Sequence, residues 1–88
     1  MILQLVAEFI ATWALVLSVH STSNWLAIGA TLAVIILLIG PVSGGYANPA
    51  ITLSMYLDSK IPMMTALAYV AAQLFGAVSA FYTYKALA

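Results

Sequence analysis

Three long apolar stretches constrain this chain more than any other feature of its sequence. Residues 1–19, 25–42 and 61–84 are almost wholly apolar, and the only charged residue within them is an acid in the first. A helix needs about 20 apolar residues to cross the hydrocarbon core of a bilayer. The sequence therefore predicts an all-α, multi-pass integral membrane protein with transmembrane helices at residues 3–20, 25–42 and 61–85.

The scarcity of charge excludes several other classes of protein. Asp, Glu, Lys and Arg make up 5% of the 88 residues, whereas a soluble domain carries about a quarter. A soluble globular enzyme is therefore excluded, and the zero net charge leaves no basic patch for nucleic acid. The chain has no Cys, one His and no nucleophile–base pair. We expect no catalytic residue, no metal site and no cofactor, and a lipid bilayer as the surroundings.

The segment between the second and third stretches predicts a helix too short to cross the membrane. Gly44 and Gly45 are turn residues, Asn48 is a favoured N-cap, and Pro49 is favoured at the first helical position. A largely apolar helix of about nine residues is predicted there, or about 13 Å of helix against a hydrocarbon core of ~30 Å. Residues 43–57 therefore predict a re-entrant loop and half-helix, which is tolerated inside a membrane when it lines a water-filled path. An interfacial helix lying flat is the alternative.

Three motifs resemble one known family. They are AEFIAT at residues 7–12, SGGYANPAIT at 43–52 and YVAAQLFGA at 69–77. They resemble the first-helix, first Asn-Pro-Ala loop and third-helix signatures of the aquaporin and aquaglyceroporin (major intrinsic protein) family, in the same order. The resemblance covers residues 1–88 as a single half-length repeat. It implies three transmembrane helices plus one re-entrant half-helix, equal to one inverted repeat of the aquaporin fold.

The resemblance also implies an activity. In the family, two half-helices enter from opposite faces and meet at the midplane, each aiming a partly positive N-terminus inward, where Asn side chains donate to water and cations are repelled. This implies a passive channel for water and small neutral solutes such as glycerol. A lone half-helix would leave N–H groups facing lipid, at a cost of several kcal/mol each. We therefore expect an antiparallel homodimer, and the resemblance implies clustering of several pores.

Candidate pore residues are those positions of this sequence that match the pore positions of the family. The resemblance assigns nine residues to the pore and its mouths: Asn48, Pro49, Ala50, Gly44, Gly45, Tyr46, Ile51, Ile28 and Ile36. The carbonyls of the residues at 44–46 would form a ladder of acceptors. Ile51 stands where the family's second repeat has an Arg, so two identical copies would have apolar mouths without a fixed cation. Such mouths predict weak discrimination among neutral solutes, or a dewetted and closed path.

Glu8 is the one acid within a span, and two readings of it remain open. An intramembrane carboxylate is a functional candidate by default. In the first reading Glu8 titrates and serves a proton- or cation-coupled small transporter, as in short multidrug transporters. In the second, implied by the resemblance, Glu8 accepts hydrogen bonds from the half-helix loop. We separately expect the amide of Gln73 to tie its own helix to that loop.

A stripe of small residues favours close helix packing. Its members recur every four residues, a spacing that allows helix backbones to approach closely: Ala68, Ala72, Gly76 and Ala80.

The placement of the two lysines bears on orientation in the membrane. Lys60 shares a side of the membrane with the N-terminus in the predicted topology, and Lys85 lies on the other side. One basic residue on each side gives no preferred orientation, which predicts dual topology. The alternatives are a separate protein that carries the other half, and a fragment or engineered half that does not conduct.

Overall fold

The computed structural model describes residues 1–88 and is entirely helical. Its helices are α1 (Ile2–Thr22), α2 (Trp25–Ser43), α3 (Pro49–Leu57) and α4 (Met63–Leu87). By length and composition, α1, α2 and α4 can each cross a membrane, whereas α3 has nine residues. The predicted fold class, an all-α membrane protein with three spans and one short helix, is confirmed.

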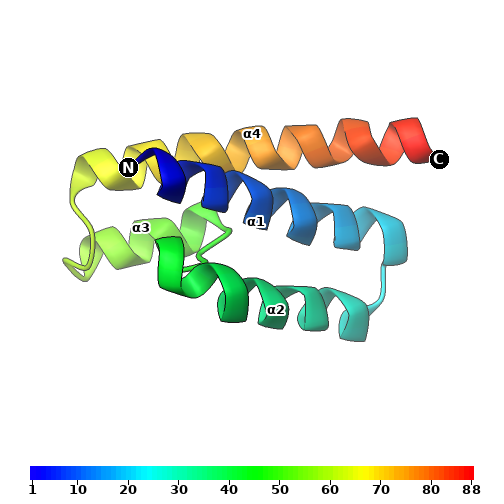
Figure 1. Ribbon diagram of the computed structural model, residues 1–88, viewed down its shortest axis with the longest axis horizontal. Coiled ribbons are helices and arrows are strands. Elements are labelled where there is room, and N and C mark those ends of the chain that lie inside the picture. The colour runs from blue at the N-terminus through cyan, green and yellow to red at the C-terminus, as the bar shows by residue number, and fades with distance from the viewer.

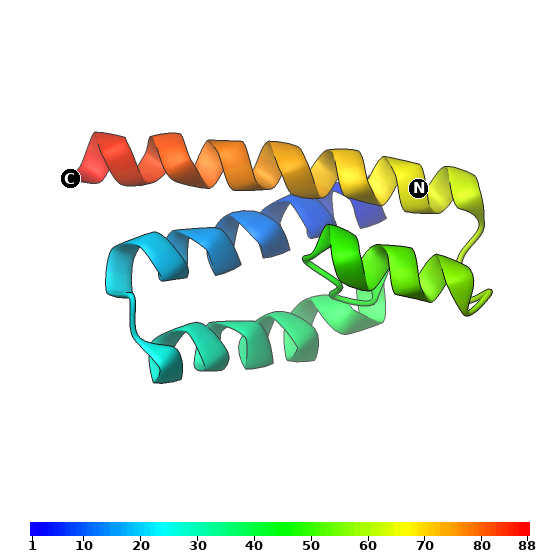
Figure 2. The same cartoon turned by 180° about the vertical axis from the view of Figure 1, so that it is seen from behind.

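The three long helices run up and down side by side, and the chain folds back between the second and third of them (Figure 1). The loop after α2 returns to the middle of the bundle, and α3 then runs outward beside the first half of α4 (Figure 2). Along their lengths α1 packs against both α4 and α2, while α3 packs against α4. Because α2 and α3 do not pack together, the side of the bundle between them is open.

Local signals explain where the helices begin and end. Asn24 caps α2, because its Oδ1 accepts hydrogen bonds from the N–H groups of Leu26 and Ala27 at 3.0 and 2.9 Å. Gly44 ends the same helix in the left-handed conformation, with φ 98°. Pro62 precedes the first residue of α4, so this helix starts at Met63, two residues after the start of the apolar run.

The contact between α1 and α4 depends on small residues. Ala11 and Ala80 are fully buried, and a Cβ built on Gly76 would lie 2.6 Å from the carbonyl oxygen of Phe9 in α1. The buried face of α4 comprises Ala66, Tyr69, Gln73, Gly76 and Ala80. Its steps of three and four residues follow the helical repeat of 3.6, and a strict four-residue spacing drifts off the face. Ala68 and Ala72 accordingly lie at its half-buried edge.

The interior is polar and the exterior is apolar. The largest fully buried side chains are those of Gln73, Glu8 and Thr52, whereas many large hydrophobic side chains, such as Leu37, Leu53 and Phe75, are exposed. A soluble protein of this size would bury the second set and expose the first. The arrangement suits a lipid exterior, where polar side chains face the bundle interior and find partners there.

Candidate functional site

The loop of residues 44–47 has an unusual backbone. Gly44, Gly45 and Ala47 have positive φ angles of 98°, 64° and 54°. A Cβ added at Gly44 would lie 2.6 Å from the ring of Tyr46, so that ring would have to move, and a Cβ added at Gly45 would lie 3.3 Å from the Cα of Ile36. Ala47 is a non-glycine residue in the left-handed region, which is sparsely populated and persists where the surroundings impose it.

Glu8 holds this loop in place. Its carboxylate is fully buried. Oε1 accepts hydrogen bonds from the N–H of Ala47 and from Nε2 of Gln73, both at 2.8 Å. Oε2 accepts from the hydroxyl of Ser43 at 2.6 Å and from the N–H of Tyr46 at 3.2 Å. A buried carboxylate is costly unless it is hydrogen-bonded, and here four donors from two helices and the loop compensate it.

The network continues to the start of the half-helix. The amide of Gln73 donates to Thr52 Oγ1 at 2.7 Å, and that hydroxyl lies 3.0 Å from the carbonyl oxygen of Asn48, to which it can donate. Separately, the hydroxyl of Tyr69 donates to the carbonyl of Ser43 at 2.9 Å. Side chains from α1, α4 and α3 therefore fix both ends of the loop.

Asn48 begins α3 and keeps a free donor. Its Oδ1 accepts the N–H of Ala50 at 2.8 Å, and Pro49 occupies the first turn, where its missing N–H is not needed. The side-chain NH₂ of Asn48 makes no hydrogen bond with the protein, and neither do the carbonyls of residues 44–47. The NH₂ donor of the half-exposed Asn48 thus follows the four free carbonyl acceptors of residues 44–47 along the chain.

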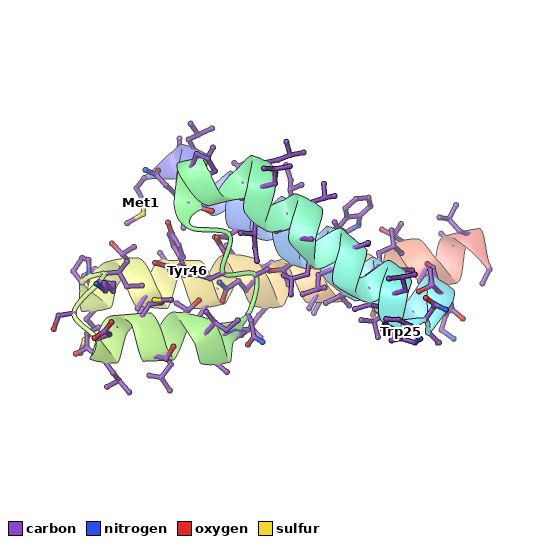
Figure 3. The ribbon with its side chains drawn as sticks, turned by 90° about the horizontal axis from the view of Figure 1, so that it is seen from below. Met1, Trp25 and Tyr46 are labelled. Atoms are coloured by element: carbon purple, nitrogen blue, oxygen red, sulfur yellow. The ribbon has the colours of Figure 1, made fainter.

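The remaining predicted pore residues lie on two separate helices. Ala50 and Ile51 are exposed on α3, Ile36 is exposed on α2, and Ile28 is half-buried there. Tyr46 lies in the half of the molecule that also holds Met1, far from Trp25 at the other end (Figure 3). None of the hollows in the surface of the chain includes a residue between 44 and 51. A single copy therefore brings these residues to an open side and encloses no path.

Three residues of the network were not predicted from the sequence to hold the loop: Ser43, Thr52 and Tyr69. Two of them carried a usable signal. Tyr69 lies four residues before Gln73 and Thr52 four residues after Asn48, so each shares a helix face with a residue that had been singled out. Ser43 carried no such signal, because only the turn after α2 brings it to Glu8.

Comparison with known proteins identifies the family. The sequence model described as Major intrinsic protein matches residues 1–88. The chain belongs to the major intrinsic protein family. Aquaporin-5 of Homo sapiens is 39% identical over 85 residues, and that of Mus musculus 38%; each match covers 83% of this chain and 32% of the relative. Lens fiber major intrinsic protein of Oryctolagus cuniculus is 41% identical over 60 residues, covering 68% of this chain and 23% of the relative.

The family assignment agrees with what the site offers chemically. This major intrinsic protein is an integral, multi-pass membrane protein that spans about a third of the length of the aquaporin-5 relatives. Its loop presents neutral donors and acceptors, and its one buried charge is covered by hydrogen-bonding partners. No group of three or more His, Cys, Asp and Glu side chains is close enough together to hold a metal ion.

Proposed function

We propose that this protein forms a passive channel for water and small neutral solutes such as glycerol. The observation that carries the proposal is the half-helix that starts in the middle of the bundle, with the free NH₂ of Asn48 and the free carbonyls of residues 44–47 at its start. Water needs both donors and acceptors along its path. The partly positive N-terminus of α3 opposes cations at the same point.

The pore is completed by a second copy in the opposite orientation. One copy encloses no cavity at Asn48, and the side between α2 and α3 is open. An inverted second copy would bring its own half-helix to the same depth and restore two-fold symmetry in the membrane plane. Lys60, in the turn between α3 and α4, and Lys85, near the C-terminus, lie toward opposite ends of the bundle, so the basic residues favour neither orientation. Several such pairs cluster into a larger assembly, as the family resemblance implies.

Selectivity in this pair is weak. Ile51 and Ile36 would give apolar mouths, Ile28 adds to the α2 wall, and Gly45 contributes only its backbone. Without a fixed cation at either mouth, discrimination would rest on width and on the carbonyl ladder. The pathway would pass water and glycerol and exclude ions, and it performs no chemical reaction.

The role of Glu8 in this proposal is to position the loop. Its carboxylate is fully buried and uses both oxygens to accept hydrogen bonds from Ser43, Tyr46, Ala47 and Gln73. A carboxylate that carried protons or cations through a transport cycle would have to be reached from water. Burial and full pairing therefore favour the loop-supporting role of Glu8 and Gln73 over coupled transport.

Osmotic swelling of proteoliposomes tests the channel directly. Vesicles with the protein should respond to an osmotic step several-fold faster than empty vesicles. Ala50→Trp should abolish the difference because it fills the space beside Asn48, whereas Leu57→Trp, at an exposed position on the same helix, should leave it unchanged. Correctly folded protein that never exceeds empty vesicles would refute the proposal.

A further inference from the structure

The turn between α3 and α4 lies at one tip of the molecule (Figure 1). A hollow lined by polar and apolar residues lies at this turn. Tyr56, Ser59, Lys60, Ile61 and Pro62 line it, and its volume of about 440 Å³ is ample for a phosphate group. We call it the turn hollow. It lies outside the candidate pore, because it shares no residue with the loop that begins α3.

The polar side chains of the turn hollow have no partners within the protein. Lys60 forms no ion pair, and neither the hydroxyl of Tyr56 nor that of Ser59 makes a hydrogen bond. The lining therefore offers one cation and two hydroxyl donors. The only other Lys or Arg of the chain, Lys85, lies over the rings of Phe81 and Tyr84, 5.7 and 6.0 Å from their centroids.

The backbone around the turn hollow is held by hydrogen bonds. The N–H of Lys60 donates to the carbonyl of Met55 at 2.9 Å, and the N–H of Ser59 donates to that of Tyr56 at 3.0 Å. The polar groups are thus presented from a closed turn.

The position of the turn hollow identifies the source of its ligand. The long axis of the molecule measures 39 Å, longer than a hydrocarbon core of ~30 Å, so the tips reach the headgroup layer. The turn hollow combines apolar Ile61 and Pro62 with a cation and hydroxyls, which matches the boundary between acyl chains and phosphate. We propose that the turn hollow binds the phosphate of an anionic phospholipid headgroup, such as that of phosphatidylglycerol.

Asp58 limits the strength of this site. It is exposed one residue before Ser59 and does not line the turn hollow, but its charge opposes an anion nearby. Lys60 should favour phosphatidylglycerol over zwitterionic phosphatidylcholine by about fivefold, the effect of one basic residue at a membrane surface. Neutralising Asp58 should increase that preference.

Lipid binding to the detergent-solubilised protein tests the site without any measurement of flux. The midpoint of thermal unfolding, followed by tryptophan fluorescence, would be recorded during titration with short-chain phosphatidylglycerol, short-chain phosphatidylcholine or inorganic phosphate. Phosphatidylglycerol should raise the midpoint at about fivefold lower concentration than phosphatidylcholine. Lys60→Gln should remove this preference and Lys60→Arg should retain it, Asp58→Asn should enlarge it, and Lys85→Gln is the matched control that should leave it intact.

Three outcomes would overturn the proposal. Equal responses to the two lipids in the unmodified protein would show that the turn hollow does not recognise an anion. If Lys60→Gln and Lys85→Gln lost the preference for phosphatidylglycerol equally, the preference would depend on the total charge of the protein and not on the turn hollow. A response to inorganic phosphate as strong as that to phosphatidylglycerol would make the ligand a soluble anion in place of a lipid.

Discussion

Gln73 donates a hydrogen bond from Nε2 to Oε1 of Glu8 at 2.8 Å, although 65 residues separate them in the sequence. The bond joins the last helix to the first, directly behind the loop that starts the half-helix. The same amide also donates to Thr52 on α3. One side chain therefore connects three helices, and the position of Asn48 depends on it.

Glu8→Gln should destabilise the protein by about 2–4 kcal/mol, since charge-assisted hydrogen bonds are worth about 1.5–3 kcal/mol each and part of the set survives. In this variant an NH₂ donor replaces one of the two acceptor oxygens of Glu8 and faces other hydrogen-bond donors. Thermal unfolding in detergent should show the loss, and water permeability should fall with it. A variant that unfolds like the unmodified protein yet loses cation-driven transport would instead favour the transporter reading.

Gly76→Ala should weaken the contact between α1 and α4, because its Cβ would lie 2.6 Å from the carbonyl oxygen of Phe9. We expect a loss of about 1–3 kcal/mol, the usual cost of overpacking. Gly29→Ala is the control: no atom lies within 4 Å of its Cβ, so the better helix propensity of alanine should leave stability unchanged or raised. Equal unfolding midpoints for the two variants would contradict this account.

Exchange of glycine and alanine should destabilise the protein at the first residue of the loop and be tolerated at the last. Gly44→Ala meets both an unfavourable φ of 98° and the ring of Tyr46, and should cost about 1–3 kcal/mol. Ala47→Gly relieves a positive φ of 54° and should leave the unfolding midpoint within a few degrees of the original. Swelling rates should fall in the first variant and persist in the second. A Gly44→Ala protein that conducts normally would show that the loop is not constrained as described.

Added positive charge should impose one orientation. Ser21→Lys with Ser23→Lys adds charge at the turn between α1 and α2, and Asp58→Lys with Ser59→Lys adds it at the other end. Each double variant alone should lose most of its water permeability, because antiparallel pairs cannot form, and co-expression of the two should restore it. Full permeability from either one expressed alone would exclude the antiparallel pair.

The sequence predicts the long helices and the short one because their signals are local. Apolar length defines the spans, and Asn48 with Pro49 marks the start of α3. The hydrogen bond between Glu8 and Gln73 is different: no spacing rule relates residues so far apart, and only the family resemblance favours a loop-supporting role for Glu8. The open side between α2 and α3 could not be predicted from the sequence either, because it depends on how the helices pack.

The backbone of Ala47 could not be predicted either. A positive φ is uncommon for alanine, and nothing in its neighbours demands it. It follows from the hydrogen bond between its N–H and Glu8, which exists only in the folded bundle. The buried face of α4 is an intermediate case: a four-residue stripe of small residues found Gly76 and Ala80, but helical drift carried the buried face to Tyr69 and Gln73.

The network around Glu8 also sets an order of events during biosynthesis. The loop of residues 44–47 leaves the ribosome before the helix that carries Gln73 and Tyr69. Until that last helix is inserted, the half-helix has no neighbour to pack on, because along its length α3 packs against α4 alone. In the proposed re-entrant arrangement, the short helix would therefore take up its place in the bilayer only after translation of the final span, and truncation within that span should leave residues 44–57 at the membrane surface.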